Sequence, residues 1–266
     1  MDKRAIGVFD SGLGGLTVVK EIRKILPNES IIYLGDTARI PYGTRSKETV
    51  VRFSFEDANF LLGKKIKCIV VACNTASALA FSSLVKVIKI PVFEVITPAA
   101  KKAVRMTKVK KIGAIGTRGT ITSRAYERKI KKEDRSVGVF SQACPLLVPI
   151  IEEDEMDPKV LAIVIQKYLR GLKKKKIDTL ILGCTHYPII KDAIGKFLGK
   201  DVALVNPGEE VVLNLKDFLI KKGLDSPRNL RSVRKYYVTD LTDRFTKVAE
   251  MFLGEELKGK IRRIDL

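Results

Sequence analysis

Short apolar runs alternate with longer helical patterns along the whole chain, and this alternation restricts the possible fold more than any other feature of the sequence. The helical patterns repeat apolar residues on one face, as Val19, Ile22 and Ile25 do before the stop at Pro27. Alternation of this kind predicts an α/β fold with mostly parallel sheets flanked by helices. Strands are predicted at Ala5–Phe9, Ile31–Leu34, Ile66–Val71, Val92–Val95, Ile112–Ile115, Val137–Ser141, Thr179–Leu182, Val202–Val205 and Tyr236–Thr239. Helices are predicted at Leu16–Leu26, Lys47–Leu62, Pro158–Leu172, Glu209–Ile220 and Arg244–Phe252.

Two segments of the first half of the chain recur in the second half. IGVFDSGLGGLTV (Ile6–Val18) resembles IGAIGTRGTITS (Ile112–Ser123), and VVACNTASA (Val70–Ala78) resembles ILGCTHYPI (Ile181–Ile189). The order and the separation are nearly the same, which predicts two similar lobes related by a pseudo-two-fold axis. We expect residues 1–96 plus 207–266 to form the first lobe and residues 97–206 the second. Because open α/β sheets bind ligands at the carboxyl ends of their strands, the active site is expected in the cleft between the lobes.

Cysteine usage limits the chemistry that the chain can support. Its 266 residues contain four cysteines, no C-x-x-C motif and the single histidine His186. A disulfide framework is not expected in a chain of this length, and a Cys/His zinc site has few ligands available. We interpret Cys68 and Cys144 as small buried hydrophobic residues. No metal ion or cofactor is expected.

The chain carries a formal net charge of +20, which raises the question of nucleic-acid binding. The lysines are dispersed, and no zinc finger, RNA-binding aromatic motif or arginine-rich tail accompanies them. Nucleic acid is therefore not expected as the main partner. No apolar run approaches the roughly 18 residues of a membrane span, and the first residues show no apolar signal region. We expect a cytoplasmic protein that does not bind a membrane.

Cys73 and Cys184 are the most informative single residues. Each follows a short apolar run and a small residue, and each precedes what the sequence predicts to be the start of a helix. A helix N-terminus is expected to lower the pKa of a thiol from about 8.5 toward neutrality. Two facing thiols suit a reaction in which one removes a proton from a carbon and the other returns a proton to the opposite face. The pair therefore predicts a racemase.

The loop Asp10–Gly15 follows the first predicted strand and contains three glycines. It fails the G-x-G-x-x-G pattern because Thr17 stands at the third glycine position, and it lacks the Gly-Lys-Ser/Thr of a phosphate loop. We expect its glycines to free backbone N–H groups for a small anion. Asp10 is predicted to point into the cleft; its alternative role is a helix N-cap.

Several further polar residues lie beside the two thiols or in similar loops. His186 follows Cys184 closely and is expected to orient or protonate its surroundings. The segment CPLLVPIIEED places Glu152 and Glu153 after an apolar run, and either carboxylate is a candidate to assist the Cys184 side. GDTARIPYG (Gly35–Gly43) predicts a turn with an aromatic wall.

Five motifs together resemble the aspartate/glutamate racemase superfamily, in the order in which its glutamate branch carries them. They are VFDSGLGGLTV, YLGDTARIPYG, VVACNTASA, CPLLVPIIEE and GCTHYP, and they span essentially the whole chain. The resemblance implies two α/β lobes and a cofactor-independent, two-base interconversion of L- and D-glutamate that supplies peptidoglycan synthesis. It also implies a homodimer.

The resemblance assigns roles to individual residues. Cys73 is the base toward D-glutamate, Cys184 is the base toward L-glutamate, and Glu152 is the assisting carboxylate. From their positions beside the two thiols, Asp10 and His186 are expected to assist catalysis as well. The implied substrate contacts are Asp10, Ser11, Pro41, Tyr42, Gly43, Asn74, Thr75, Thr117, Thr120, Thr185 and His186. Two alternatives stay open: a racemase of the same superfamily that acts on aspartate or on another amino acid, and a basic nucleic-acid-associated protein with this fold.

Overall fold

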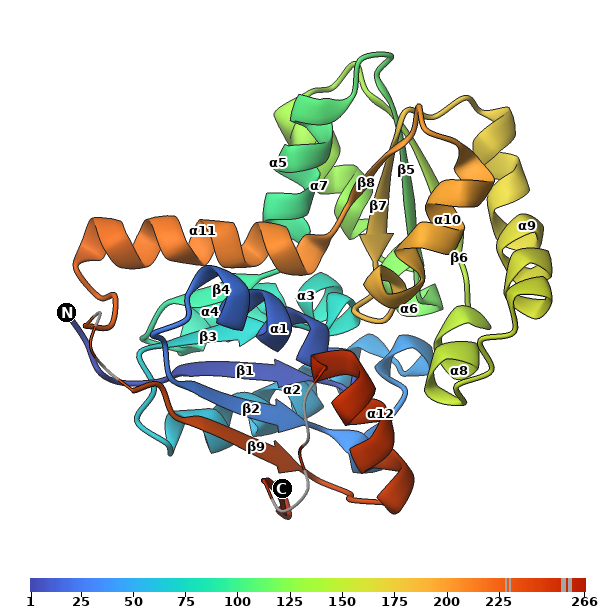
Figure 1. The fold of residues 1–266 in the computed structure, drawn as a ribbon. Helices are drawn as coiled ribbons and strands as arrows, with labels where there is room; N and C mark the ends of the chain where they lie inside the picture. The colour runs from blue at the N-terminus through green and yellow to red at the C-terminus, as the bar shows by residue number, and fades with distance from the viewer. Residues whose placement is uncertain (228, 230, 255–256, 258–259) are drawn as a thin grey trace.

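The computed structural model describes residues 1–227, 229, 231–254, 257 and 260–266, and it contains two parallel β-sheets flanked by helices (Figure 1). The first sheet has the strand order β10-β9-β2-β1-β3-β4 and the second the order β6-β5-β7-β8. The predicted fold class is thereby confirmed. Each of the nine predicted strand segments overlaps an observed strand, whereas β10 was not predicted. The strands are β1 (Ile6–Asp10), β2 (Ile31–Gly35), β3 (Cys68–Val71), β4 (Val92–Glu94), β5 (Lys111–Gly116), β6 (Gly138–Ala143), β7 (Thr179–Gly183), β8 (Ala203–Val205), β9 (Arg234–Val238) and β10 (Ile261–Arg263).

Helices cover both sheets, and those predicted from the sequence are all present. The prediction gave no bounds for the other helices. Most of these carry too few turns to show a clear apolar period, although the 11-residue helix Ile96–Met106 was missed as well. The α-helices are α1 (Leu16–Ile25), α2 (Lys47–Leu62), α3 (Asn74–Leu79), α4 (Phe81–Val87), α5 (Ile96–Met106), α6 (Arg118–Thr122), α7 (Ala125–Glu133), α8 (Leu147–Glu152), α9 (Pro158–Lys174), α10 (Lys191–Leu198), α11 (Pro207–Lys222) and α12 (Asp243–Leu253). The described residues also form three 3-10 helices: η1 (Thr37–Arg39), η2 (Tyr42–Thr44) and η3 (Tyr187–Ile190).

The two sheets share one strand order. β1 lies between β2 and β3, with β4 outside β3, and β5 lies in the same way between β6 and β7, with β8 outside β7. Strands β1 and β7 are buried along their whole length, as is usual for parallel strands covered on both faces. Because β3 and β7 hold equivalent places, the residues that follow them occupy equivalent corners of the two lobes.

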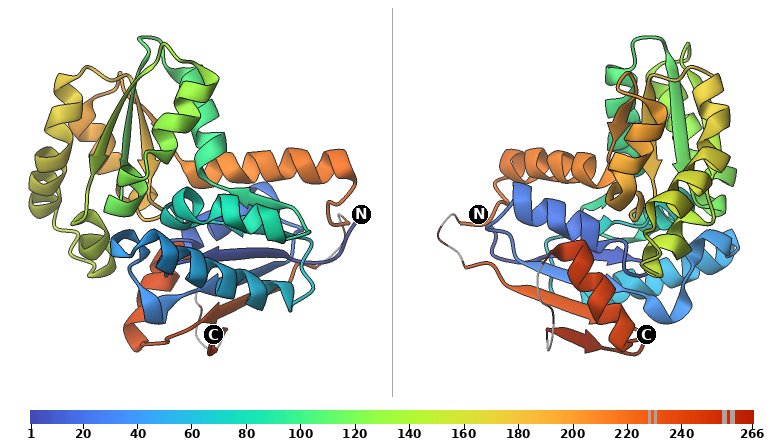
Figure 2. Two further views of the ribbon diagram at one scale, coloured as in Figure 1. Left: turned by 180° about the vertical axis from the view of Figure 1, so that it is seen from behind. Right: turned by 45° about the vertical axis from the view of Figure 1, so that its right-hand side comes forward.

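Two long helices lie where the chain passes from one sheet to the other. The chain leaves the first sheet through α5 and returns through α11, which packs against both α1 and α5 (Figures 1 and 2). After α11 the chain adds β9 beside β2, so that residues near the C-terminus complete the first sheet. The C-terminal helix α12 packs on α1. No helix in the described residues is both long and apolar enough to cross a membrane.

Local sequence explains where two of the longer helices, α9 and α11, begin. Asp157 caps α9 by accepting hydrogen bonds from the backbone N–H groups of Lys159 and Val160, and Pro158 occupies the first turn, where its missing N–H costs nothing. α11 begins in the same way after Asn206. These caps satisfy backbone groups that the helices themselves leave without partners.

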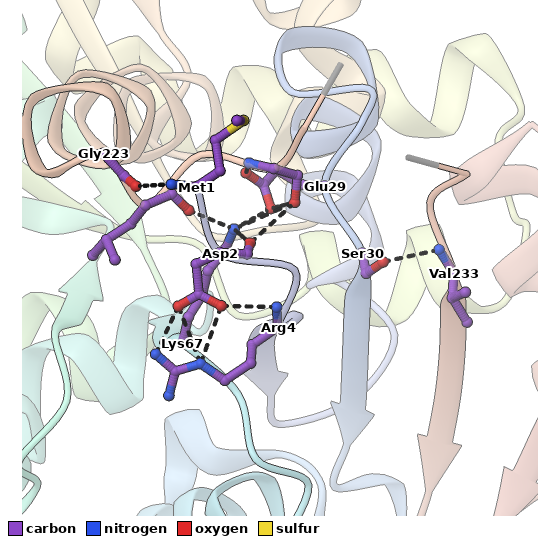
Figure 3. A network of polar contacts seen from close by, with 10 residues as sticks. Met1, Asp2, Arg4, Glu29, Ser30, Lys67, Gly223 and Val233 are labelled. Atoms are coloured by element: carbon purple, nitrogen blue, oxygen red, sulfur yellow. Dashed lines mark hydrogen bonds and ion pairs between the residues drawn. The ribbon is translucent and has the colours of Figure 1, made fainter. Parts of the chain in front are cut away.

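A buried ion pair joins the start of the first lobe to the segment that follows α11 (Figure 3). Lys67 Nζ lies 2.5 Å from Glu29 Oε2, and both side chains are almost fully buried. Lys67 also donates to the carbonyl oxygens of Asp2 at 3.0 Å and Leu224 at 2.8 Å, while the Ser226 hydroxyl donates to Glu29 at 2.9 Å. The network therefore holds the segment that follows α11 against the first sheet, at the end where β2 and β3 begin.

Replacing Lys67 by alanine leaves the Glu29 carboxylate buried without its cation. We expect Lys67→Ala to lower the free energy of unfolding by about 3–5 kcal/mol, measured by denaturant titration. The exposed Lys89→Ala is the matched control and is expected to change it by less than about 0.5 kcal/mol. Equal stability of the two variants would show that the ion pair does not hold the returning segment.

Candidate active site

A cavity of about 380 Å³ lies between the two lobes at the carboxyl ends of their strands. Its volume falls within the range of roughly 300–1,000 Å³ that is usual for small-molecule sites. Most of the residues singled out from the sequence line it. The predicted residues in its wall are Ser11, Pro41, Tyr42, Gly43, Cys73, Asn74, Thr75, Thr117, Glu152, Cys184, Thr185 and His186.

Cys73 occupies the corner between β3 and α3 and is almost fully buried. Its sulfur accepts the backbone N–H of Ala76 at 3.5 Å, as an N-cap does, and its S–H donates to Ser11 Oγ at 3.5 Å. Burial and the nearby Asp10 charge nevertheless raise the pKa of the Cys73 thiol to about 12, because these effects outweigh the two hydrogen bonds. The expectation that the helix N-terminus lowers the pKa of Cys73 toward neutrality is therefore wrong.

Cys184 occupies the equivalent corner after β7. The prediction that an α-helix begins directly after this residue in the chain is wrong. A turn follows the thiol, then the 3-10 helix η3, and α10 begins only at Lys191. Pro188 stands in the first turn of η3 and has no N–H to donate, so it cannot continue an α-helical hydrogen-bond ladder that begins at Cys184. The neighbour of the Cys184 sulfur is a side chain instead, since His186 Nδ1 lies 3.7 Å away.

His186 connects Cys184 to an acidic residue of α8. Its Nε2 lies 2.9 Å from Glu152 Oε1, which identifies Glu152 rather than Glu153 as the carboxylate that contacts the histidine; both glutamates line the cavity. Burial favours the neutral ring, but the hydrogen bonds to Cys184 and Glu152 outweigh it and raise the pKa of His186 to about 10. The ring is thus an imidazolium at neutral pH and donates from both nitrogens.

Asp10 ends β1 behind the wall of the cavity and is not part of the lining. Its Oδ2 accepts the backbone N–H groups of Gly15 at 2.9 Å and Gly12 at 3.3 Å, and burial raises the pKa of its carboxyl group. These two loop N–H groups are therefore turned toward Asp10, so the expectation that they serve a bound anion is wrong. Gly14 has another purpose: a Cβ there would lie 2.1 Å from Thr185 Oγ1, so glycine lets the second lobe approach closely.

Threonine hydroxyl groups from both lobes hydrogen-bond to one another at the cavity. Thr75 Oγ1 lies 2.9 Å from Thr117 Oγ1 and 3.2 Å from Thr120 Oγ1, and the last two are 3.0 Å apart. Thr75 and Thr117 line the cavity, whereas Thr120 lies behind them. The cluster places hydroxyl groups of both lobes at the position where a carboxylate can accept their hydrogen bonds.

Tyr42 presents its ring to the cavity and its hydroxyl group to the interior. The hydroxyl hydrogen-bonds to Asp36 and, at 3.0 Å, to Asp57. Asp57 is fully buried, and burial together with the Asp36 charge raises its pKa well above the ordinary value. This arrangement holds the loop of Pro41 and Gly43 against the second lobe.

Several residues of the cavity wall were not predicted as site residues. They are Gly12, Ile40, Thr44, Arg118, Cys144, Pro145, Val148 and Pro149. Cys144 and its neighbours belong to the CPLLVPIIEE segment, so the motif itself was the available signal. Among the described residues, no group of three or more His, Cys, Asp or Glu side chains is placed to hold a metal ion.

The chain is an α/β protein of two parallel-sheet lobes in which a thiol from each lobe lines one cavity of small-molecule size. A family model described as Asp/Glu/Hydantoin racemase matches residues 6–213. The chain belongs to this racemase family.

Individual relatives agree with the family assignment. A curated glutamate racemase of Geobacter metallireducens is 47% identical, covering 100% of this chain and 98% of that protein. The crystal structure of a glutamate racemase from Bacillus anthracis is similar with a TM-score of 0.96 and 42% identity, covering 100% of this chain and 99% of that one. A glutamate racemase from Francisella tularensis, solved in complex with D-glutamate, gives a TM-score of 0.93 and 41% identity, covering 100% and 98%.

His186 is the only histidine of the chain, so its titration can be followed directly. We expect its ring signal in the NMR spectrum of the untagged protein to titrate near pH 10. A pKa above the unfolded value of about 6.5 means that the contribution to stability is complete below pH 6.5 and is lost as the pH rises toward 10.

Glu152→Gln removes the charge that His186 contacts, and we expect the midpoint to fall toward 6.5. Glu153→Gln is the matched control and is expected to move it less. A midpoint near 6.5 in the unaltered protein would contradict the assignment of an imidazolium to this site.

Proposed function

We propose that this racemase interconverts L- and D-glutamate without a cofactor, with Cys73 and Cys184 as its two acid/base groups. The observation that carries the proposal is the placement of two buried thiols at equivalent strand ends of the two lobes, both in the wall of one cavity. The glutamate racemases among its relatives, one of them in complex with D-glutamate, support glutamate as the substrate.

In the proposed reaction, one sulfur acts as thiolate and takes the Cα proton. The electron pair of the C–H bond stays on the substrate and is delocalised into its α-carboxylate. The other thiol then gives its proton to the opposite face of Cα and becomes the thiolate. For D-glutamate the base is Cys73 and the acid is Cys184; for L-glutamate the roles exchange.

The developing carbanion needs stabilisation from fixed donors, since no electron sink is part of the proposal. The hydroxyl groups of Ser11, Thr75, Thr117 and Thr185 and the amide of Asn74 are the candidates that line the cavity. Thr75 and Thr117 hydrogen-bond to each other, Asn74 accepts from Tyr126, and Ser11 accepts from Cys73. These bonds hold the donors in place, which limits their reorganisation during the reaction. Pro41, Tyr42 and Gly43 form the wall beside them. Behind the wall, Asp10 holds the loop of Gly12 and Gly15, and Thr120 hydrogen-bonds to Thr75 and Thr117.

The raised pKa of Cys73 implies that the substrate itself helps to activate this thiol. A cation within about 4–6 Å favours the charged form of an acid, and the α-ammonium group of glutamate is such a cation. On the other side, the protonated His186 directs its Nδ1–H at Cys184, and Glu152 holds the ring in that orientation. The two thiols are thus assisted by different groups.

We further propose the lobe boundaries 1–96 plus 207–266 and 97–206, which are supported by the membership of the strands in the two sheets. A homodimer in the cytoplasm, supplying D-glutamate for peptidoglycan synthesis, completes the proposal. Exposed apolar side chains on α9 and α11, such as Ile163 and Ile220, are consistent with a contact between copies. A mass of one chain in light scattering would contradict the dimer.

Alanine variants test the two-thiol mechanism. We expect Cys73→Ala and Cys184→Ala each to lower the rate of racemisation by more than about 10³-fold, because each removes one of the two proton carriers. The measurement is the circular dichroism of glutamate in buffer, started from either enantiomer. Cys68→Ala is the matched control: this thiol is buried in β3 outside the cavity, and its variant is expected to keep most of the activity. Substantial turnover by either of the first two variants would refute the mechanism.

Aspartate is the main alternative substrate, and it differs by one methylene group. Such a difference is worth about 1–3 kcal/mol in a fitted site. We expect kcat/KM for glutamate to exceed that for aspartate by at least about tenfold, with both measured on the same protein without added cofactor. A higher value for aspartate would assign the chain to the other specificity.

A further inference from the structure

Tyr126, on α7 of the second lobe, is a buried residue that does not line the cavity and yet contacts both catalytic corners. Its hydroxyl group donates a hydrogen bond of 2.6 Å to Asn74 Oδ1. Asn74 is the first residue of α3 and directly follows Cys73. This bond crosses from the second lobe to the first.

The ring of Tyr126 packs against the other corner. A Cβ added to Gly183 would lie 2.8 Å from Tyr126 Cε2, so the absence of a side chain at Gly183 leaves the space that the ring fills. Gly183 is the last residue of β7 and directly precedes Cys184. One side chain therefore touches the neighbour of each thiol.

The direction of the hydrogen bond determines how the Asn74 amide is turned. Burial and the charges of Glu94 and Cys184 raise the pKa of the Tyr126 hydroxyl well above its ordinary value, so it keeps its proton and donates. Asn74 Oδ1 accepts that proton, and Nδ2 makes no hydrogen bond to the described part of the chain. Asn74 itself lines the cavity, so its NH₂ group is available to donate to an anionic group bound there.

We propose that Tyr126 is a positioning residue that couples the two catalytic corners, turning the Asn74 NH₂ group toward the substrate carboxylate and fixing Cys73 relative to Cys184. The proposal rests on the proposed function for the identity of the substrate, but the bond between Tyr126 and Asn74 is independent of it. Because the bond forms between lobes, the donor set for the carboxylate is complete only when the lobes are in contact.

The test is a double-mutant cycle with Tyr126→Phe and Asn74→Ala. Phenylalanine keeps the ring packing on Gly183 and removes only the hydroxyl group. We expect Tyr126→Phe to lower kcat/KM for glutamate about tenfold in the otherwise unaltered protein, and by less than about twofold when Asn74 is already alanine. Tyr168→Phe, on α9 away from the cavity, is the matched control and is expected to leave kcat/KM unchanged.

A second readout keeps the cycle decisive if the Asn74→Ala proteins turn over too slowly. Glutamate affinity is then measured by calorimetry on the same four proteins; racemisation adds no heat, since the enantiomers have equal enthalpy. Thermal unfolding of the four proteins reports on the bond without any ligand, and Tyr126→Phe is expected to lower the midpoint more in the presence of Asn74 than in its absence.

Equal losses in both backgrounds would show that Tyr126 does not act through Asn74 and would overturn the proposal. So would an unchanged kcat/KM in Tyr126→Phe. If the unaltered protein does not racemise glutamate at all, the proposed function fails, while the unfolding cycle still decides whether the bond couples the lobes.

Discussion

The structure depends on one constraint of parallel sheets: all strands of a sheet end at the same edge, so the residues that follow them gather there. The two lobes use the same strand order, with β3 and β7 beside the central strands β1 and β5. The corner that follows each of these strands therefore lies at the same place in its lobe. Cys73 and Cys184 occupy these two corners, and both line one cavity. In the proposed reaction, reprotonation on the face opposite to deprotonation follows from this repeat.

The surroundings of the two thiols are not repeated. Cys73 lies among buried groups, with Asp10 behind it and Ser11 as a hydrogen-bond partner, whereas Cys184 faces the imidazolium of His186. Enantiomers have equal free energy, so kcat/KM must be the same in both directions at every pH. The asymmetry of the site can appear only in kcat and KM taken separately. It is in these parameters that the different partners of the thiols have their effect.

Much of the fold follows from the sequence, since apolar runs and helical periods locate nine strands and five of the helices. β10 was missed because the segment Ile261–Arg263 has two arginines and no apolar run. The corner after Cys184 was predicted as a helix because of its likeness to the corner after Cys73, and Pro188 overrides that likeness. Motifs located most of the cavity wall, but they do not show that Asp10 lies behind it.

Long-range contacts set what the sequence leaves open. The pKa of Cys73 depends on its burial and on the charge of Asp10, which is distant in the sequence, and the proposed role of Tyr126 depends on a bond between residues 52 positions apart. Similarly, the choice between Glu152 and Glu153 is decided by the distance to His186 Nε2. Neighbouring residues give no sign of these relations, because each one arises only when two distant segments pack together.

The most direct measurement of the central claim is the fate of the Cα hydrogen when D-glutamate is incubated in deuterated water and sampled at low conversion. With two thiols on opposite faces, one removes the proton and the other delivers a deuteron from solvent. The account predicts that the L-glutamate formed carries one deuterium at Cα, while the recovered D-glutamate carries none. L-glutamate that retains the original hydrogen would show that one group moves the same proton between the faces and would contradict the account.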